Sequence, residues 1–232
     1  MTGPSRDVGV IIVAAGASSR VAGDELKQFS WVAGKPMLLH SLQTFMAQPD
    51  VGTVVCVLPQ RYAGDPPPWI FQCDVDRLLI SVGGRTRSES VANGLDDLPD
   101  EAQIVVVHDA ARPLVDAATI GRVVDAVRAG TSAVAGLRVV DTLKRVNDNG
   151  DVESTVPRLH LWRAQTPQGF TRQVLVDAHR RARAEHISAT DDAALVERLG
   201  LPVRMVRGSE RALKVTESAD FARAEAMLGL TE

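Results

Sequence analysis

The stretch Val8-Gly9-Val10-Ile11-Ile12-Val13, followed by Ala14-Ala15-Gly16, decides the fold of this chain. A short, continuous apolar run that ends in small residues is typical of a strand buried on both faces of a sheet. Further runs of this kind occur at residues 53–58, 78–82, 104–107 and 132–137. We therefore expect a central sheet built mainly from these buried strands.

Stretches with helical periodicity separate the apolar runs. Apolar residues follow Pro36 at helical spacing up to Met46, and proline is favoured at the start of a helix. Further elements are expected as helices at residues 88–98, 117–129, 171–185, 191–199 and 218–228, and as short strands at 203–206 and 212–215. Thr190 is the expected N-cap of the helix at 191–199. The alternation indicates an α/β fold with a mostly parallel sheet and helices on both faces.

Three loops of this predicted fold should open onto one edge of the sheet. They are residues 14–27, 83–87 and 108–113, and each follows one of the predicted strands. Ligands of such sheets bind beyond the carboxyl ends of the strands. We therefore expect these loops to form the functional site of a single domain that spans residues 1–232.

Residues 141–157 depart from this alternation. Polar and apolar residues alternate on both sides of Asn147-Asp148-Asn149-Gly150, which indicates a β-hairpin with an Asn-Gly turn. An isolated hairpin is marginally stable in water, so this one needs another surface to lie on. A partner subunit and the parent domain are the two alternatives.

Composition excludes several classes of protein. The 232 residues contain 26 Lys and Arg against 29 Asp and Glu, for a net charge of −3, whereas a general nucleic-acid binder is usually basic. The two cysteines, Cys56 and Cys73, form no CxxC pair. No apolar stretch reaches the roughly 20 residues that span a bilayer, and residues 1–7 do not resemble a signal peptide. We expect a cytoplasmic protein with no nucleic-acid or membrane partner.

The loop at residues 14–27 has the composition of a phosphate-binding loop. Ala14, Ala15 and Gly16 are small enough for backbone N–H groups to approach a phosphate, and Arg20 and Lys27 add positive charge. A surface loop with solvated cations is the alternative. The sequence contains neither GxxxxGK[ST] nor GxGxxG, which argues against a P-loop NTPase and a dinucleotide-binding dehydrogenase.

Two more clusters follow strands at the same predicted edge. Asp109, directly after an apolar strand, is suited to hold Mg²⁺ or a ribose hydroxyl, and Arg112 to orient Asp109 or to meet a substrate phosphate. An Asp–Arg surface pair is the alternative. Gly83-Gly84 suits a flat base lying on the main chain, or else a plain strand-to-helix turn with Ser88 as the cap. His108 is interpreted as a packed or hydrogen-bonded residue.

Seven blocks, in this order along the chain, resemble one enzyme family. They are Ala14-Ala15-Gly16 with Arg20 and Lys27-Gln28-Phe29, Gly83-Gly84 with Arg87-Ser88-Glu89-Ser90-Val91, His108-Asp109-Ala110-Ala111-Arg112-Pro113, Asp141-Thr142-Leu143-Lys144, Leu161-Trp162 with Gln165-Thr166-Pro167-Gln168, Thr190-Asp191-Asp192, and Leu213-Lys214-Val215-Thr216. From about Val8 to the C-terminal helix, the chain is similar to the 2-C-methyl-D-erythritol 4-phosphate cytidylyltransferases of non-mevalonate isoprenoid synthesis, a family of sugar-phosphate nucleotidyltransferases.

The resemblance implies a Rossmann-like fold, a Mg²⁺ requirement and a homodimer in which the arm, residues 141–157, is exchanged between subunits. Residues matching the cytidine site of the family are Ala14, Ala15, Gly16, Gly84 and Ser90. Those matching its triphosphate site are Arg20, Lys27 and Lys214. Those matching the surroundings of the metal, ribose and acceptor phosphate are Asp109, Ala110, Arg112, Thr142, Arg158, Thr166 and Thr190, with Asp109 on the metal and Thr142 and Arg158 coming from the neighbouring subunit.

The chain departs from the family pattern at three positions. Ser18 stands where glycine is usual, Val21 where methionine is usual, and Arg85 where an acidic residue is frequent. The first departure is expected to stiffen the loop. No contact with the base is carried over to the Arg85 side chain.

The implied reaction joins a polyol phosphate to the CMP part of CTP and releases pyrophosphate. The acceptor phosphate is largely dianionic at neutral pH, because its second pKa is about 6, so the reaction needs no general base. The expected catalytic groups are cations: Arg20 and Lys27 stabilise charge in the transition state, and Arg158 and Lys214 position the acceptor. A ribitol 5-phosphate cytidylyltransferase and a catalytically silent nucleotide-binding regulator are the alternatives.

Overall fold

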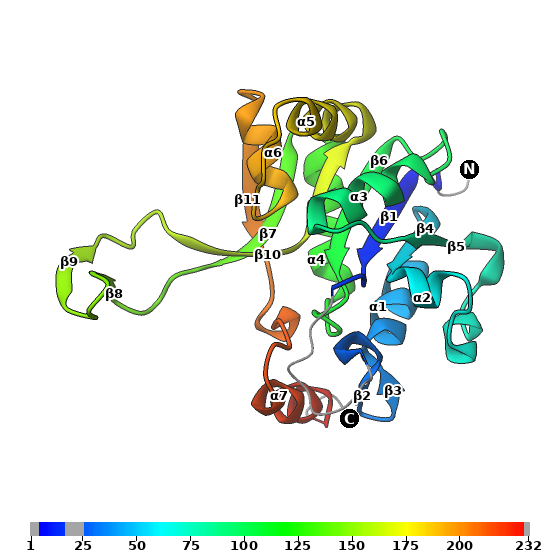
Figure 1. Ribbon diagram of the computed structural model, residues 1–232, viewed down its shortest axis with the longest axis horizontal. Helices are drawn as coiled ribbons and strands as arrows, with labels where there is room; N and C mark the ends of the chain where they lie inside the picture. Colours follow the sequence, from blue (N-terminus) through cyan, green and yellow to red (C-terminus); the bar gives the residue numbers. More distant parts are fainter. Residues whose placement is uncertain (1–4, 17–25, 230–232) are drawn as a thin grey trace.

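A seven-stranded sheet forms the centre of the molecule (Figure 1). The computed structural model describes residues 5–16 and 26–229. The strands run in the spatial order β11-β7-β10-β6-β1-β4-β5. Their bounds are Val8–Val13 (β1), Val51–Leu58 (β4), Leu78–Val82 (β5), Ile104–Asp109 (β6), Ser132–Arg138 (β7), Trp162–Thr171 (β10) and Val203–Arg207 (β11). The mostly parallel α/β sheet expected from the apolar runs is therefore confirmed.

Strand β1 lies between two parallel neighbours. Val13 is opposite Val57 of β4 and Asp109 of β6, so these strands end at nearly the same level. Strand β5 adds in parallel to β4, and β11 in parallel to β7. Only β10 runs antiparallel, between β6 and β7, among the strands that the described residues contribute to this sheet. The loops after β1, β5 and β6 consequently lie at one edge.

Helices cover both faces of the sheet, as expected from the sequence (Figure 1). Their bounds are Met37–Met46 (α1), Gln60–Ala63 (α2), Arg87–Asp96 (α3), Ala117–Arg128 (α4), Arg172–Ala184 (α5), Asp192–Arg198 (α6) and Ser218–Gly229 (α7). One core lies between the sheet and helices α1 and α4, and the other between the sheet and helices α3, α5 and α6. Consecutive residues of β1 serve opposite cores, since Ile11 packs in the second and Ile12 in the first.

Strand β10 is the strand of the central sheet that the sequence did not predict. Its stretch, WRAQTPQGFT, is polar, yet most of it is buried. Buried Gln165 donates to the Ser209 carbonyl (3.0 Å), and buried Gln168 donates to Asp191 (2.8 Å). Because these partners lie far away in sequence, no local pattern of apolar residues indicates the strand.

Three further local expectations need correction. The stretch expected as a strand at 212–215 forms no strand: Ala212 ends a 3₁₀ turn, Glu210–Ala212, and residues 213–215 are irregular. Thr190 does not cap α6; Asp191 does, by accepting from the Ala194 N–H (3.0 Å). A small two-stranded ribbon, β2 (Trp31–Val32) with β3 (Lys35–Pro36), was not expected.

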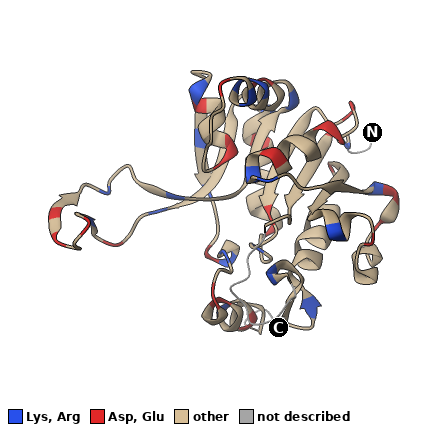
Figure 2. Ribbon diagram, in the orientation of Figure 1, with Lys and Arg blue, Asp and Glu red and all other residues tan. Residues whose placement is uncertain are grey.

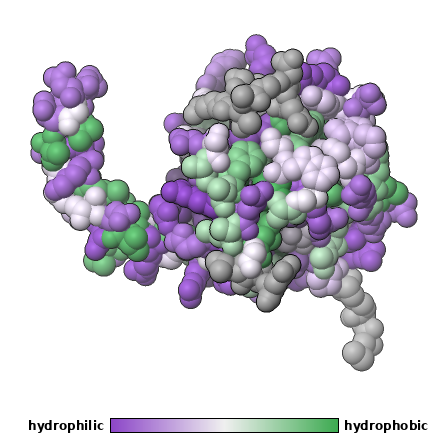
Figure 3. All heavy atoms as spheres, turned by 90° about the horizontal axis from the view of Figure 1, so that it is seen from below, coloured by the Kyte–Doolittle hydropathy of each residue, from purple (hydrophilic) through white to green (hydrophobic). Residues whose placement is uncertain are grey.

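The hairpin projects from the body as an arm (Figure 1). Its strands, β8 (Leu143–Val146) and β9 (Val152–Val156), pair antiparallel, as the sequence pattern predicts. In the turn, the Asn147 side chain accepts from the N–H groups of Asn149 (3.0 Å) and Asp151 (2.9 Å), and Gly150 has a positive φ of 87°. Figure 3 shows apolar residues exposed along the arm.

Charged residues of both signs are interspersed over the body and the arm (Figure 2). This distribution agrees with the nearly balanced charge of the sequence. Within residues 5–16 and 26–229, no helix is long and apolar enough to cross a membrane.

Candidate active site

A pocket of about 550 Å³ opens where the loops after β1, β5 and β6 meet. This is the edge of the sheet at which the sequence predicts the site. Nine of the predicted site residues line it: Ala14, Ala15, Gly16, Lys27, Gly84, Ser90, Asp109, Ala110 and Lys214. The other lining residues are Val13, Gln28, Arg85, Thr86, Arg87 and Ala111. The lining thus combines small residues with charged side chains.

Gln28 holds the start of the first loop in place. Its side-chain amide donates to the Ala14 carbonyl and, at 3.4 Å, to the Gly16 carbonyl. Lys27 precedes it in a short 3₁₀ turn and is only 7% exposed. The buried charge of Lys27 thus lines the pocket beside the small residues. Arg20, together with the departures at Ser18 and Val21, lies outside the described residues.

Asp109, at the end of β6, is the one carboxylate among the described residues that line this pocket. Its Oδ1 accepts from Arg87 Nε (3.1 Å), and its Oδ2 accepts from Lys214 Nζ (2.9 Å). Burial alone would raise the pKa of Asp109, but the charges of Arg87 and Lys214 outweigh it and hold the pKa well below its ordinary value. Asp109 is therefore a carboxylate with two cationic neighbours at neutral pH.

Hydrogen bonds that involve His108 and Thr166 hold Asp109 in place. The Asp109 N–H donates to Thr166 Oγ1 (3.0 Å), and that oxygen lies 3.0 Å from His108 Nδ1. His108 Nε2 lies 3.1 Å from the Arg112 carbonyl, which can only accept, so we assign the proton to Nε2. The ring is neutral and buried, which confirms the interpretation of His108 as a packed, hydrogen-bonded residue.

This buried histidine predicts a loss of stability in mild acid. Burial lowers the pKa of His108 from 6.5 to about 4. Between these two values the unfolded chain binds the proton and the folded chain does not, so the stabilisation present at neutral pH is lost as the pH falls. We expect the His108 contribution to the free energy of unfolding to drop by about 2 kcal/mol between about pH 7 and pH 5. Urea unfolding at both pH values would measure it.

His108→Gln is the matched variant for that measurement, because glutamine does not titrate there. Its free energy of unfolding should fall less steeply over the same interval, by the amount assigned to His108. Equal slopes for the two proteins would contradict the assignment.

The turn after β5 is held by Thr86 rather than by Ser88. Thr86 caps α3 by accepting from the Glu89 N–H (3.1 Å), which corrects the expectation of a Ser88 cap. Ser90 donates to the Thr86 carbonyl (2.9 Å) and accepts from the Gly84 N–H (3.1 Å). A Cβ on Gly83 would lie 2.1 Å from the Ala15 Cβ, so this glycine lets the turn approach the β1 loop.

Arg112 does not orient Asp109 as suggested by the sequence. Among the described residues, its guanidinium instead donates to the backbone carbonyls of Ala212 (2.7 Å) and Ala164 (3.5 Å). It thereby ties the β6 loop to the segment that carries Lys214. The same segment is also fixed by the Val215 N–H, which donates to the Ala111 carbonyl (2.8 Å).

Besides Arg112 and Thr166, three predicted site residues lie outside the lining formed by the described residues. Thr142 and Arg158 are exposed on the arm and its return, and Thr190 is exposed just before α6. Their predicted roles therefore depend on a second subunit or on a bound acceptor.

The sequence reasoning assigned no role to Arg87 or Asp192, although both lie inside quoted blocks. Arg87 NH1 donates to Asp192 Oδ2 (2.7 Å), so Arg87 bridges Asp192 and Asp109. The signal in the sequence for a site residue here was the charge of Arg87 at the start of α3. Its partners could not be identified, because they lie on β6 and α6.

Comparisons with known proteins agree with this geometry. The family model described as "IspD: 2-C-methyl-D-erythritol 4-phosphate cytidylyltransferase" matches residues 8–230. The chain is 36% identical to the enzyme of that name from Syntrophus aciditrophicus (strain SB), covering 94% of both chains, and 40% identical to that from Prochlorococcus marinus (strain MIT 9313), covering 95% of this chain and 98% of the relative.

A solved structure gives the same result. The crystal structure of the cytidylyltransferase of that name from Thermus thermophilus superposes with a TM-score of 0.80 at 36% identity, covering 95% of this chain and 98% of the other. On these grounds, the chain belongs to the 2-C-methyl-D-erythritol 4-phosphate cytidylyltransferase family.

Proposed function

We propose that this protein transfers the cytidylyl group of CTP to 2-C-methyl-D-erythritol 4-phosphate and releases pyrophosphate. The observation that carries the proposal is the pocket itself, which buried Lys27 and the Arg87–Asp109–Lys214 cluster line together with small residues. Such a pocket combines close backbone approach to a nucleotide with positive charge for its phosphates.

In this reaction an oxygen of the acceptor phosphate attacks the α-phosphorus of CTP, and the bond to the β-phosphate oxygen breaks. The acceptor is already largely dianionic at neutral pH, since its second pKa is about 6, so no general base is required. The main task of the site is to bring two anions together and to stabilise charge at phosphorus. We assign that stabilisation to Lys27 with Arg20, and the positioning of the acceptor phosphate to Lys214 with Arg158.

The donor set at Asp109 fits a magnesium ion. A carboxylate has about four acceptor positions, and Arg87 and Lys214 use two of those on Asp109. No cluster of three His, Cys, Asp or Glu side chains able to hold a metal occurs in the described part of the chain, so Asp109 would share the ion with phosphates and water, as Mg²⁺ commonly does. When bound, the ion neutralises phosphate charge.

For the nucleoside, we assign the base to Gly84 in the turn after β5, to Ser90 of α3 and to the small residues after β1. We assign the ribose and the phosphates to the part of the same pocket that Asp109 and Ala110 line. The Thr166 hydroxyl accepts a hydrogen bond from the backbone N–H of Asp109 (3.0 Å). Thr166 therefore supports Asp109 and does not itself line the pocket. Arg112 and Thr190 are assigned to the acceptor side.

We further infer a homodimer in which the arm, residues 141–157, contacts the partner and brings Thr142 and Arg158 to its site. Four apolar residues on the arm and at its base are well exposed: Val140 (71%), Val146 (51%), Val152 (61%) and Leu159 (70%). An isolated two-stranded hairpin is marginally stable in water and is stabilised when it packs on another surface. The unpaired Cys56 and Cys73 fit a reducing compartment, and we place the protein in the cytoplasm.

A pyrophosphate-release assay tests the proposed activity. CTP, ATP, GTP and UTP are each supplied with Mg²⁺ and methylerythritol phosphate, and CTP should be used in clear preference. Ribitol 5-phosphate replaces the acceptor in a parallel series, and faster release with it would transfer the assignment to that acceptor. Binding of CTP without release in either series would indicate a silent nucleotide-binding regulator.

A further inference from the structure

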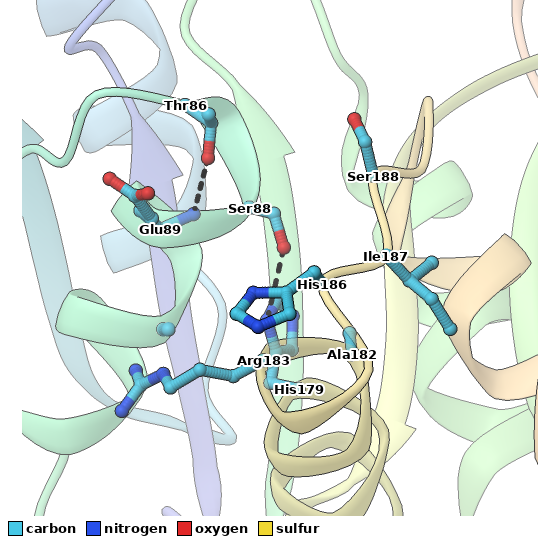
Figure 4. Close-up of a pocket in the computed structure, with 10 residues that line it drawn as sticks. Thr86, Ser88, Glu89, His179, Ala182, Arg183, His186, Ile187 and Ser188 are labelled. Atoms are coloured by element: carbon cyan, nitrogen blue, oxygen red, sulfur yellow. Dashed lines mark hydrogen bonds between the residues drawn. The ribbon is translucent and has the colours of Figure 1, made fainter.

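A second pocket of about 280 Å³ lies behind the start of α3, against the end of α5 (Figure 4). His179 of α5 and Ser88 of α3 both line it, and Figure 4 shows the two side chains pointing toward one another. Ser88 Oγ lies 3.5 Å from His179 Nδ1, at the limit of a hydrogen bond. Both pockets share Thr86, so only the turn that begins α3 separates them.

His179 reaches from this second pocket to Asp192. His179 Nε2 lies 3.0 Å from Asp192 Oδ1, and the two side chains are 6% and 1% exposed. A carboxylate accepts, so Nε2 carries the hydrogen and Nδ1 is left to accept from Ser88. Burial alone would raise the pKa of Asp192, but the bonds to His179 and Arg87 outweigh it and lower that pKa.

The other oxygen of Asp192 fixes Arg87. Arg87 NH1 donates to Asp192 Oδ2 at 2.7 Å, while only Nε donates to Asp109 Oδ1, at 3.1 Å. A free guanidinium would prefer to grip one carboxylate with two parallel bonds. Because Asp192 engages NH1, Arg87 presents a single donor to Asp109, and Asp109 Oδ2 stays with Lys214.

The role of His179 follows from the way in which Asp192 and Asp109 each bind one donor of Arg87. If Asp192 Oδ1 lost its donor, a buried carboxylate oxygen would be left unsatisfied. Arg87 could then satisfy both oxygens of Asp192 only by rotating away from Asp109. We propose that His179 is a positioning residue for cytidylyl transfer: by binding Asp192, it fixes the orientation in which Arg87 holds Asp109. This inference rests on the function proposed above.

The test compares two amides at the same position. In His179→Gln the side-chain nitrogen lies about where Nε2 lies in histidine, so it still donates to Asp192. In His179→Asn the side chain is too short for its nitrogen to reach Asp192. We expect His179→Asn to lower kcat roughly tenfold, as is typical for partners behind a metal-binding side chain, with the KM for CTP little changed. His179→Gln should retain most of the wild-type kcat.

A double-mutant cycle separates positioning from a general structural effect. If His179 acts through Asp109, the His179→Asn change should lower kcat little further once Asp109 has been replaced by asparagine. A loss of folded protein would instead reduce activity by the same factor in both backgrounds. Thermal unfolding of all four proteins accompanies the kinetics.

His186→Asn is the matched control, since His186 lines the same pocket and has a φ of 52° that asparagine tolerates. It should leave kcat unchanged. The proposal is overturned if His179→Gln and His179→Asn behave alike, or if the His179→Asn effect is the same in the Asp109→Asn background. A wild-type protein that releases no pyrophosphate would instead refute the proposed function itself.

Discussion

Replacing Lys27 with alanine is expected to lower kcat for cytidylyl transfer by roughly 100-fold or more, by analogy with the loss of one donor to a developing oxyanion. Lys27 is 7% exposed and lines the pocket, so its charge acts where water screens it little. The rate of pyrophosphate release under saturating CTP and acceptor measures the effect.

Lys35→Ala is the matched control for this variant. Lys35 lies a few residues further along, on β3, where its exposed side chain donates to Gln43 (2.9 Å). It should behave like the wild type. A Lys27→Ala protein with near-normal kcat and only a raised KM would show that Lys27 binds the ground state alone. An unchanged rate after both Arg20 and Lys27 are made neutral would refute the catalytic assignment as a whole.

Mixing two inactive variants is expected to restore activity, if the arm serves the neighbouring subunit. Lys27→Ala damages the pocket in the body, and Arg158→Ala removes a side chain just after the arm, which the arm is proposed to carry to the partner's site. In a mixed dimer with exchanged arms, one site receives both defects and the other receives none. Random subunit exchange should therefore recover about a quarter of the wild-type activity, because about half of the dimers are mixed and each has one intact site.

A second mixture controls for this recovery. Lys27→Ala with Lys214→Ala places both defects in the body pocket of their own chains, so each site in a mixed dimer keeps one defect. No activity should return in that mixture. Native mass spectrometry establishes that mixed dimers have formed. Mixed dimers of Lys27→Ala and Arg158→Ala that remain inactive would mean that the arm does not complete its partner's site.

An element could be predicted from the sequence where its own residues show why it forms, and could not where it depends on residues distant in the chain. Strand β1 was identified from its own residues, because continuous apolar sequence reflects burial on both faces. Strand β10 was not, because buried Gln165 and Thr166 are polar and depend on distant partners: Thr166 bonds to His108 (3.0 Å), and Gln165 bonds to Ser209 (3.0 Å). The prediction that Arg112 orients Asp109, one of the two roles suggested for it, was wrong for a similar reason, since the Ala212 carbonyl that Arg112 binds is remote in sequence.

The sequence by itself determined the alternation of strands and helices, and with it the edge where Ala14, Gly84 and Asp109 meet. Tertiary structure alone decided the partners of Asp109, because Arg87 lies 22 residues away from it in the chain and Lys214 lies 105 residues away. The spacing of apolar residues within a helix or strand indicates which of its faces is buried, and this spacing can be seen in the local sequence. Ion pairs and hydrogen bonds form only between groups within a few ångströms, and folding sets which distant groups come that close.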